Sequence, residues 1–412
     1  MEALNINSKK IDHDKVINYL LIGYALCLPI SKAGVNIFET LILLTWIIQG
    51  NWKEKYTLYK SNLLIVSLMM FLLLNILSIP WASSFPFALE YIGKYRHFLV
   101  ILPIYSSLDK KFIQYIFSSF LAGMFLSELV SYGIFFELIH YKNIPPTNPA
   151  PFMNHSDYSV FLSFASILLL SRLIDNTPLS IKRQVVYILF FITTTSNLFL
   201  NGGRTGQVTF IVIIFIKLIM CLDHKIKATL IAIFLIISVF LTAYVISPNF
   251  HARTNQTLQD INLMIYQDDF ETGALGQRVS FWIIGLDDLK DNIFGHGIGN
   301  DVKNVRYYAE KRGYAASTTS SDTFTDHHNM FLTIALQLGL IGSFIIFSMF
   351  YAIFTLSFKS ENYKILNLTF IVAFSMWSFG GMTFHLMNSM IFFALFAGLF
   401  NAISKIEKGE AK

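Results

Sequence analysis

Three side chains at the edges of long apolar segments are the best suited to chemistry. Arg204 lies in the stretch LNGGRTGQVT, Arg278 opens a helical pattern in QRVSFW, and His328 lies in DHHNMFL, where the chain becomes apolar again. Arginine presents a planar fork of N–H donors that fits phosphate oxygens bidentately. Histidine can accept a proton near neutral pH. Together these residues predict binding of a diphosphate, with His328 either accepting a proton from an attacking hydroxyl group or holding the diphosphate as well.

Other polar residues in apolar surroundings are weaker candidates for contacts with a substrate. They are His327 and Asn329 beside His328, Lys94 and Arg96 in EYIGKYRHFLV, and His155 in NPAPFMNHSDYSVF. Charged residues within a membrane span usually face the interior of the helix bundle. Structural roles are the alternatives: the two histidines as interfacial residues, and Lys94 as a salt-bridge partner of Glu90. Asp326 is expected to cap the helix that follows it.

The composition indicates that these residues belong to an integral membrane protein. Hydrophobic residues make up 54% of the 412 residues and charged residues only 14%, whereas soluble domains average about 25% charged residues. The apolar runs predict an all-α polytopic fold with about 12 transmembrane helices, since each crossing needs about 20 largely apolar residues. The runs centre near Leu21, Leu43, Met70, Val100, Leu121, Leu168, Phe191, Ile213, Ile236, Ile341, Ile371 and Leu395.

The distribution of basic residues predicts the orientation in the bilayer. Short cytoplasmic loops hold most of the Lys and Arg in membrane proteins, and here one set of alternate loops is rich in both. Both termini are therefore expected in the cytoplasm, which puts Arg204 on the outer face. The sequence has no phosphate-binding loop, dinucleotide fingerprint or zinc-type Cys/His spacing. We therefore expect no cofactor, no metal and no nucleic-acid partner, and no disulfide between Cys27 and Cys221.

One hydrophilic segment, residues 247–327, is large enough to hold a site on the outer face. It separates residues 1–246, with about nine of the predicted spans, from residues 328–412, with about three spans and a cytoplasmic tail. Other loops are short, so this segment is the expected place for chemistry.

Local patterns within this segment predict its elements. Apolar residues from Val279 to Ile293 recur at helical spacing, with a polar face that includes Asp288, and predict one amphipathic helix against the membrane or the bundle. SPNFHARTNQT, before it, is a Pro/Asn/Thr-rich exit from the membrane. GHGIGN, after it, is typical of a helix stop, or of a turn whose N–H groups bind an anion. Residues 306–325 lack periodicity and predict a loop.

The order of three motifs resembles that of the O-antigen ligases, in the superfamily that includes the O-antigen polymerases. The motifs are NGGRTG, GQRVSFW…DNIFGHGIGN and HHNMFL…LGLIG. The resemblance implies a GT-C-like helical fold in the bacterial inner membrane, with one large periplasmic loop. It implies metal-independent transfer of a glycan from undecaprenyl diphosphate to the lipid A–core at the periplasmic face. Arg204 and Arg278 would match the diphosphate-binding arginines, and His328, followed by Asn329, the catalytic histidine.

Three alternatives remain open at the level of the sequence. An O-antigen polymerase uses the same lipid-linked donor, and the presence of one large outer loop here favours a ligase over it. A protein O-oligosaccharyltransferase differs only in its acceptor. A transporter predicts inverted repeats and interrupted helices near the middle of the membrane, and neither pattern is evident.

Overall fold

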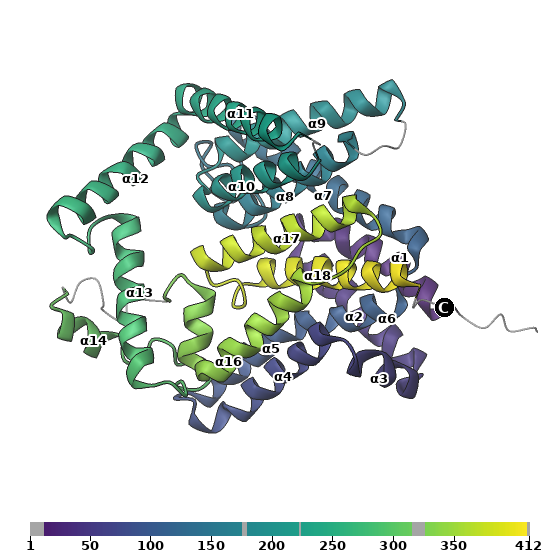
Figure 1. The fold of residues 1–412 in the computed structure, drawn as a ribbon, viewed down its shortest axis with the longest axis horizontal. Helices are drawn as coiled ribbons and strands as arrows, with labels where there is room; N and C mark the ends of the chain where they lie inside the picture. Colours follow the sequence, from purple (N-terminus) through teal and green to yellow (C-terminus); the bar gives the residue numbers. More distant parts are fainter. Residues whose placement is uncertain (1–11, 175–178, 222–223, 315–325, 410–412) are drawn as a thin grey trace, which may run out of the picture.

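The computed structural model describes residues 12–174, 179–221, 224–314 and 326–409, and all regular structure in these ranges is helical. Figure 1 shows the helices gathered into one bundle with an arm at one end. The longer helices are α1 (His13–Cys27), α2 (Lys32–Gln49), α3 (Trp52–Lys60), α4 (Leu63–Leu77), α5 (Phe85–Tyr95), α6 (Ile101–Ser107), α7 (Ile113–Phe135), α8 (His155–Ile174), α9 (Ile181–Leu200), α10 (Arg204–Cys221), α11 (Lys225–Ile246), α12 (Pro248–Gln267), α13 (Gly273–Asp291), α14 (Val305–Arg312), α16 (Met330–Phe354), α17 (Glu361–Gly380) and α18 (Met387–Lys408). Short 3-10 helices are η1 (Ile79–Trp81), η2 (Arg96–Val100) and η3 (Lys110–Phe112).

The apolar helices confirm a polytopic membrane protein. Seven helices of the described ranges are long and apolar enough to cross a bilayer, or eight if α2 and α3, bent by 111°, form one span. Every predicted span centre lies within an α-helix except that near Val100, which ends η2. The remaining helices at those centres, such as the 15-residue α1, do not meet the same criterion of length and apolarity. The number of about 12 crossings therefore stays a prediction.

Helix α18 forms the centre of the bundle. In its most apolar stretch, 94% of the residues are buried inside the protein, and Figure 1 shows it between α17 and α6. Its phenylalanines pack against rings from two neighbouring helices, with centroid distances of 4.6–4.8 Å. The ring pairs are Phe392 with Phe161 on α8, Phe396 with Phe164 on α8, and Phe393 with Phe374 on α17. Edge-to-face and tilted ring pairs of this kind add to the burial of apolar area.

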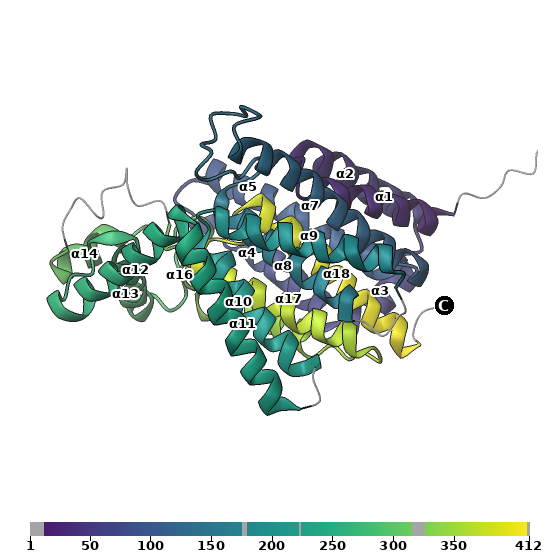
Figure 2. The same ribbon diagram turned by 90° about the horizontal axis from the view of Figure 1, so that it is seen from above.

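Helices α12, α13 and α14 form an arm at the end of the bundle away from the C-terminus (Figures 1 and 2). The description of SPNFHARTNQT as an exit from the membrane is incomplete, because Ser247 caps α12 there by accepting a hydrogen bond from the Phe250 N–H at 3.2 Å. Proline at the first helical position suits this start, since its missing N–H needs no partner there. The loop predicted over 306–325 is also wrong at its beginning, where α14 forms, while residues 315–325 lie outside the described ranges.

The amphipathic helix predicted over 279–293 is present as α13, with a different buried face. It starts at Gly273, so Arg278 lies in its second turn and not at its start. Asp288, predicted on the polar face, is only 2% exposed. Its carboxylate lies 3.0 Å from His296 Nε2 and accepts a hydrogen bond from Asn304 at 2.9 Å. The periodicity of the helix placed Asp288 on the polar face because its partners, His296 and Asn304, lie after the end of the helix.

The turn GHGIGN, residues 295–300, packs into a break in helix α16. Its three glycines have φ between +77° and +87°, as expected for a turn of this composition. At Gly339, with φ +66°, α16 leaves helical geometry. The N–H groups of His296 and Gly297 donate to carbonyl groups of α16 just before the break, each at 2.8 Å. These N–H groups are bound to protein, so the anion-binding alternative for this turn is wrong.

Candidate active site

The glycines around Arg204 bring helix α10 directly against α8. A Cβ atom added at Gly203 or Gly206 would overlap atoms of Ser159 on α8, so the close approach depends on the absence of side chains. The Gly206 N–H donates to Ser159 Oγ at 3.1 Å. Because Arg204 is the first residue of α10, this packing fixes it beside the first turn of α8, which begins at His155.

Three arginines from three helices converge at this end of the bundle. Arg204 of α10 interacts electrostatically with Arg253 of α12 and Arg278 of α13, and both Arg204 and Arg253 interact with His155. Arg204 Nη1 donates to Thr257 Oγ1 on α12 at 2.9 Å. The structure thus brings together Arg204, Arg278 and His155, which sequence analysis had placed on one face.

The three guanidinium groups are not neutralised by the protein. Within the described ranges, none of them lies within 4.0 Å of a carboxylate oxygen, whereas the arginines of α14 pair with Glu310 and Asp287. Burial lowers the pKa of the Arg278 guanidinium, and the negative charge of Asp326 partly offsets this effect. Arginine stays protonated in proteins even so. Three adjacent positive charges without ion pairs are suited to a multiply charged anion.

Arg253 is the member of this cluster that sequence analysis missed. It lies in SPNFHARTNQT, which has no helical hydrophobic periodicity and was expected only as an exit from the membrane. Helix α12 instead turns the segment back, so that Arg253 reaches Arg204 from across the site. One feature of the sequence could have identified Arg253. It is a basic residue soon after an apolar run, on the outer face predicted for Arg204, where positive charge is otherwise rare.

His328 forms a hydrogen-bonded pair with Asp326. His328 Nδ1 lies 2.9 Å from Asp326 Oδ1, and the same oxygen accepts the backbone N–H of His328 at 2.6 Å. His328 adopts a left-handed backbone with φ +49°, a conformation that few residues other than glycine adopt. Its side chain is 41% exposed. With Nδ1–H donating to the carboxylate, Nε2 carries the lone pair and can accept a proton.

The electrostatics keep Asp326 ionised. Burial raises the pKa of its carboxyl group. Hydrogen bonds from His328 and the charge of His328 lower this pKa by more than burial raises it, so the net pKa lies below the ordinary value. Asp326 also interacts with Arg278, so the carboxylate connects the histidine to the arginine cluster. The ring of Phe281 on α13 stacks beside His328, with a centroid distance of 6.3 Å.

The neighbours of His328 have structural roles. His327 is completely buried, lies 3.7 Å from Asp301 through Nδ1, and packs its ring against Gly285 of α13. Its backbone carbonyl accepts the indole N–H of Trp282 at 3.1 Å. Asn329 caps α16 by accepting a hydrogen bond from Leu332. The prediction that Asp326 caps this helix is therefore wrong, and of the two adjacent histidines only His328 is exposed.

Lys94 and Arg96 lie on α5 and η2, apart from the arginine cluster. Lys94 Nζ pairs with Glu90 at 2.9 Å, the salt bridge expected from the sequence, and a role of Lys94 in substrate binding stays a prediction. Arg96 donates to Asn36 Oδ1 on α2 at 3.0 Å and is 54% exposed. No described contact brings Arg96 to His328 or to the arginines, so its role in substrate binding stays a prediction.

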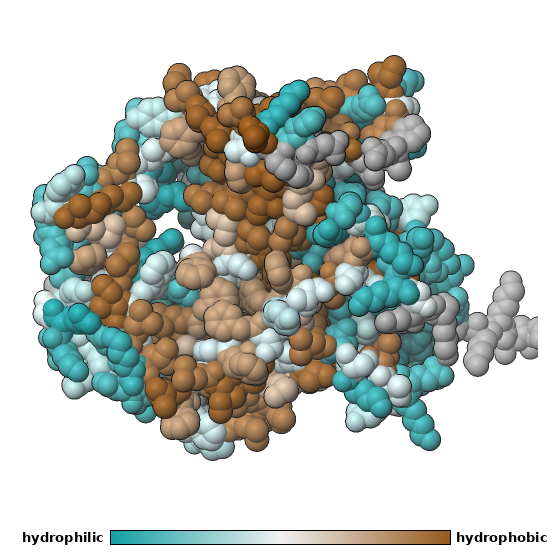
Figure 3. Space-filling view, in the orientation of Figure 1, coloured by the Kyte–Doolittle hydropathy of each residue, from teal (hydrophilic) through white to brown (hydrophobic). Residues whose placement is uncertain are grey.

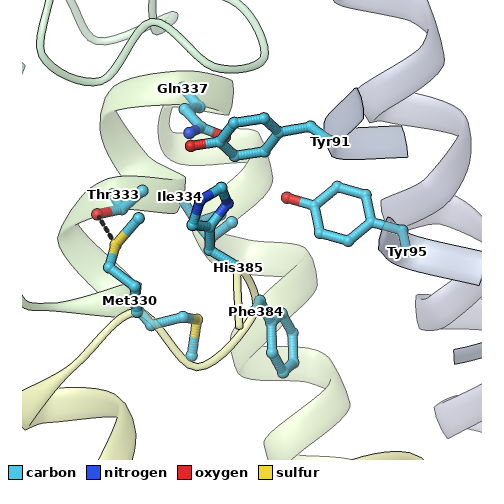
Figure 4. A pocket seen from close by; sticks show the side chains of 9 residues that line it. Tyr91, Tyr95, Met330, Thr333, Ile334, Gln337, Phe384 and His385 are labelled. Carbon is cyan, nitrogen blue, oxygen red and sulfur yellow. Dashed lines mark hydrogen bonds between the residues drawn. The ribbon is translucent and has the colours of Figure 1, made fainter. Parts of the chain in front are cut away.

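A small, mostly apolar pocket joins α5 to the segment around His385 (Figure 4). The rings of Tyr91 and His385 lie 4.4 Å apart, and Gln337 of α16 lines the same pocket. Burial and the positive charge of Lys94 lower the pKa of His385, and Asp301 and Asp326 act in the opposite direction. This pocket therefore lies within electrostatic reach of the Asp326–His328 pair.

The surface is open where the arm meets the bundle. Figure 3 shows a gap between α12–α13 and the ends of the bundle helices, with hydrophilic residues along its rim. An arginine cluster with the Asp326–His328 pair near Arg278 suits a reaction that releases a phosphate-bearing leaving group and takes a proton from a nucleophile. Among the described residues, no group of three or more His, Cys, Asp or Glu side chains could hold a metal ion.

Comparison with known proteins agrees with this chemistry. Residues 189–347 match the model of a family described as O-Antigen ligase, and this range contains Arg204, Arg253, Arg278 and His328. An uncharacterized protein of Haemophilus influenzae is 31% identical over 146 residues, which are 35% of this chain and 36% of that protein. The chain thus matches about a third of the length of this curated relative. This similarity over residues 189–347 supports membership of the superfamily of O-antigen ligases and polymerases.

Proposed function

We propose that this protein is an O-antigen ligase, a glycosyltransferase that moves a glycan from undecaprenyl diphosphate to the lipid A–core. The reaction would take place at the periplasmic face of the bacterial inner membrane. The observation that carries the proposal is the cluster of three arginines without ion pairs, one of which, Arg278, lies near the Asp326–His328 pair. A lipid diphosphate is the kind of ligand that such a site is suited to bind at a membrane surface.

The proposed chemistry is one displacement at the anomeric carbon of the donor glycan. A hydroxyl oxygen of the acceptor bonds to this carbon while the bond from the carbon to the diphosphate oxygen breaks. The electron pair leaves with undecaprenyl diphosphate, and the hydroxyl proton passes to His328 Nε2. Asp326 holds His328 in the required tautomer and stabilises the resulting imidazolium. Arg204, Arg253 and Arg278 stabilise the developing charge of the diphosphate, so in this proposal no metal ion is required.

Lipopolysaccharide from cells that lack the gene tests the proposal. We expect that long glycan ladders vanish from the lipid A–core while lipid-linked polymer accumulates, and that the wild-type gene restores the ladders. If single repeat units still reach the core, the protein is a polymerase and the ligase assignment is wrong. An unchanged pattern would also contradict it and would favour transfer to a protein acceptor.

A further inference from the structure

A groove opens between the helices that flank the arginine cluster. It has a volume of about 350 Å³ and lies between one end of α9 and one end of α11. The α9 wall includes Ser196 and Phe199, and the α11 wall includes Ser238, Thr242 and Ala243. Small side chains predominate at these positions of otherwise bulky helices, which leaves space between the two walls.

The surroundings of the groove are those of a surface that faces lipid. In the apolar stretch of α11 only 12% of the residues are buried. Large apolar side chains along both helices are exposed, among them Ile192 on α9 and Phe234 on α11. Apolar patches larger than a few hundred Å² normally mark an interaction site, and in a chain that crosses a membrane the surrounding medium is hydrocarbon.

One end of the groove leads directly to the arginines. Ser247, at this end, donates through Oγ to the Phe199 carbonyl at 2.9 Å, which ties the start of α12 to the end of α9. Asn249 adds a contact with the Leu200 carbonyl at 3.3 Å. From the two walls the chain continues within a few residues to Arg204, after α9, and to Arg253, after α11.

We propose that this groove holds the isoprenyl chain of the lipid diphosphate, next to its headgroup. The inference rests on the proposed function, because it assigns the tail of a ligand whose diphosphate binds Arg204 and Arg253. Charge complementarity at one end and an apolar, lipid-facing lining along the rest match the two parts of such a molecule.

Filling the groove in the full-length protein tests this inference. We would replace Thr242 by Trp on the α11 wall and, separately, Ser196 by Trp on the α9 wall, and measure binding of undecaprenyl diphosphate in lipid nanodiscs. Each variant should bind it at least about tenfold more weakly, the loss expected when about two methylene groups lose their buried contacts. Competition by inorganic diphosphate, which has no chain, should be unchanged.

Two control variants separate the possible outcomes. Leu241→Trp adds the same ring to a 56% exposed position of α11 outside the groove lining, and should bind like the wild type. Arg204→Ala should weaken binding of both probes. If the two groove variants bind undecaprenyl diphosphate normally while Arg204→Ala does not, bilayer lipid fills the groove and this inference is wrong, although the proposed function stands. If Arg204→Ala binds both probes normally, the proposed function itself is wrong.

Discussion

His328 Nδ1 lies 2.9 Å from Asp326 Oδ1, and the two residues are separated in sequence only by the buried His327. The left-handed backbone at His328 accompanies this arrangement, in which one carboxylate oxygen accepts both the ring and the backbone N–H of His328. Such strained positions cost about 1–3 kcal/mol and occur preferentially at functional sites. The pair therefore orients an exposed imidazole toward the surface that the arginines share.

Replacing Asp326 by Asn should impair catalysis much more than binding. An amide can donate to Nδ1 and so favour the wrong tautomer of His328, and we expect kcat to fall by about 100-fold or more. Because the pKa of Asp326 lies below its ordinary value, the wild-type carboxylate stays ionised from about pH 6 to pH 8. The loss should therefore be evident throughout this range, measured as glycan transfer by the purified protein.

Asp287→Asn is a matched control for that experiment. Asp287 lies on the same arm, and its pKa is held at about 2 mainly by a hydrogen bond from Arg312, away from His328. This variant should keep wild-type kcat. Equal losses in the two variants, or wild-type kcat in Asp326→Asn, would contradict the assigned role of Asp326.

Replacing Arg204 by Lys should not restore activity, although it keeps the positive charge. Lysine is a point charge without the planar fork that binds two phosphate oxygens at once, and it also loses the hydrogen bond from Arg204 Nη1 to Thr257. We expect a loss of about 100-fold in kcat/KM, the scale for removing one charge-stabilising donor. Arg306→Lys, on an 83% exposed side chain, serves as the control. Full activity of Arg204→Lys would argue against bidentate binding.

Arg253→Gln tests the arginine that only the structure revealed. Glutamine removes the charge but keeps a polar side chain that can still reach Gln256, the present partner of Arg253 Nη1. We expect KM for the lipid-linked donor to rise by about tenfold, the value of one hydrogen bond to a charged group. The thermal unfolding temperature in detergent should not change. An unchanged KM together with normal folding would remove Arg253 from the binding site.

The convergence of Arg204 and Arg278 could be predicted from the sequence, because Arg278 lies in the hydrophilic segment and Arg204 was expected on the same outer face. The role of Arg253 could not, since it depends on how α12 folds back, and local periodicity contains no information on this. Capping gives another example. Asp326 and Asn329 are both good cap residues, and the choice of Asn329 follows from the left-handed backbone of the residue between them.

The span near Val100 shows why counting apolar runs has limits. Composition there is apolar enough for a crossing helix, yet the chain forms a 3-10 turn at Arg96–Val100 and then the short helix α6. Pro103 lies in the first turn of α6 and cannot donate a backbone hydrogen bond to the preceding turn. Mean hydropathy depends only on the side chains of such a run. It contains no information on where the backbone hydrogen bonds of the run are interrupted.

Replacing Gly206 by Ala should destabilise the protein and displace Arg204. A Cβ atom there would overlap the backbone and side chain of Ser159, and overpacking of this kind costs about 1–3 kcal/mol. Gly93→Ala is the control, because its added Cβ meets no atom within 4 Å, and in helix α5 it should be neutral or stabilise by about 0.5–1 kcal/mol. Thermal unfolding in detergent measures both effects.

Because α10 carries Arg204 as its first residue, Gly206→Ala should also weaken donor binding at temperatures where the variant is still folded. Unchanged stability in Gly206→Ala would show that the close contact between α8 and α10 does not position the arginine.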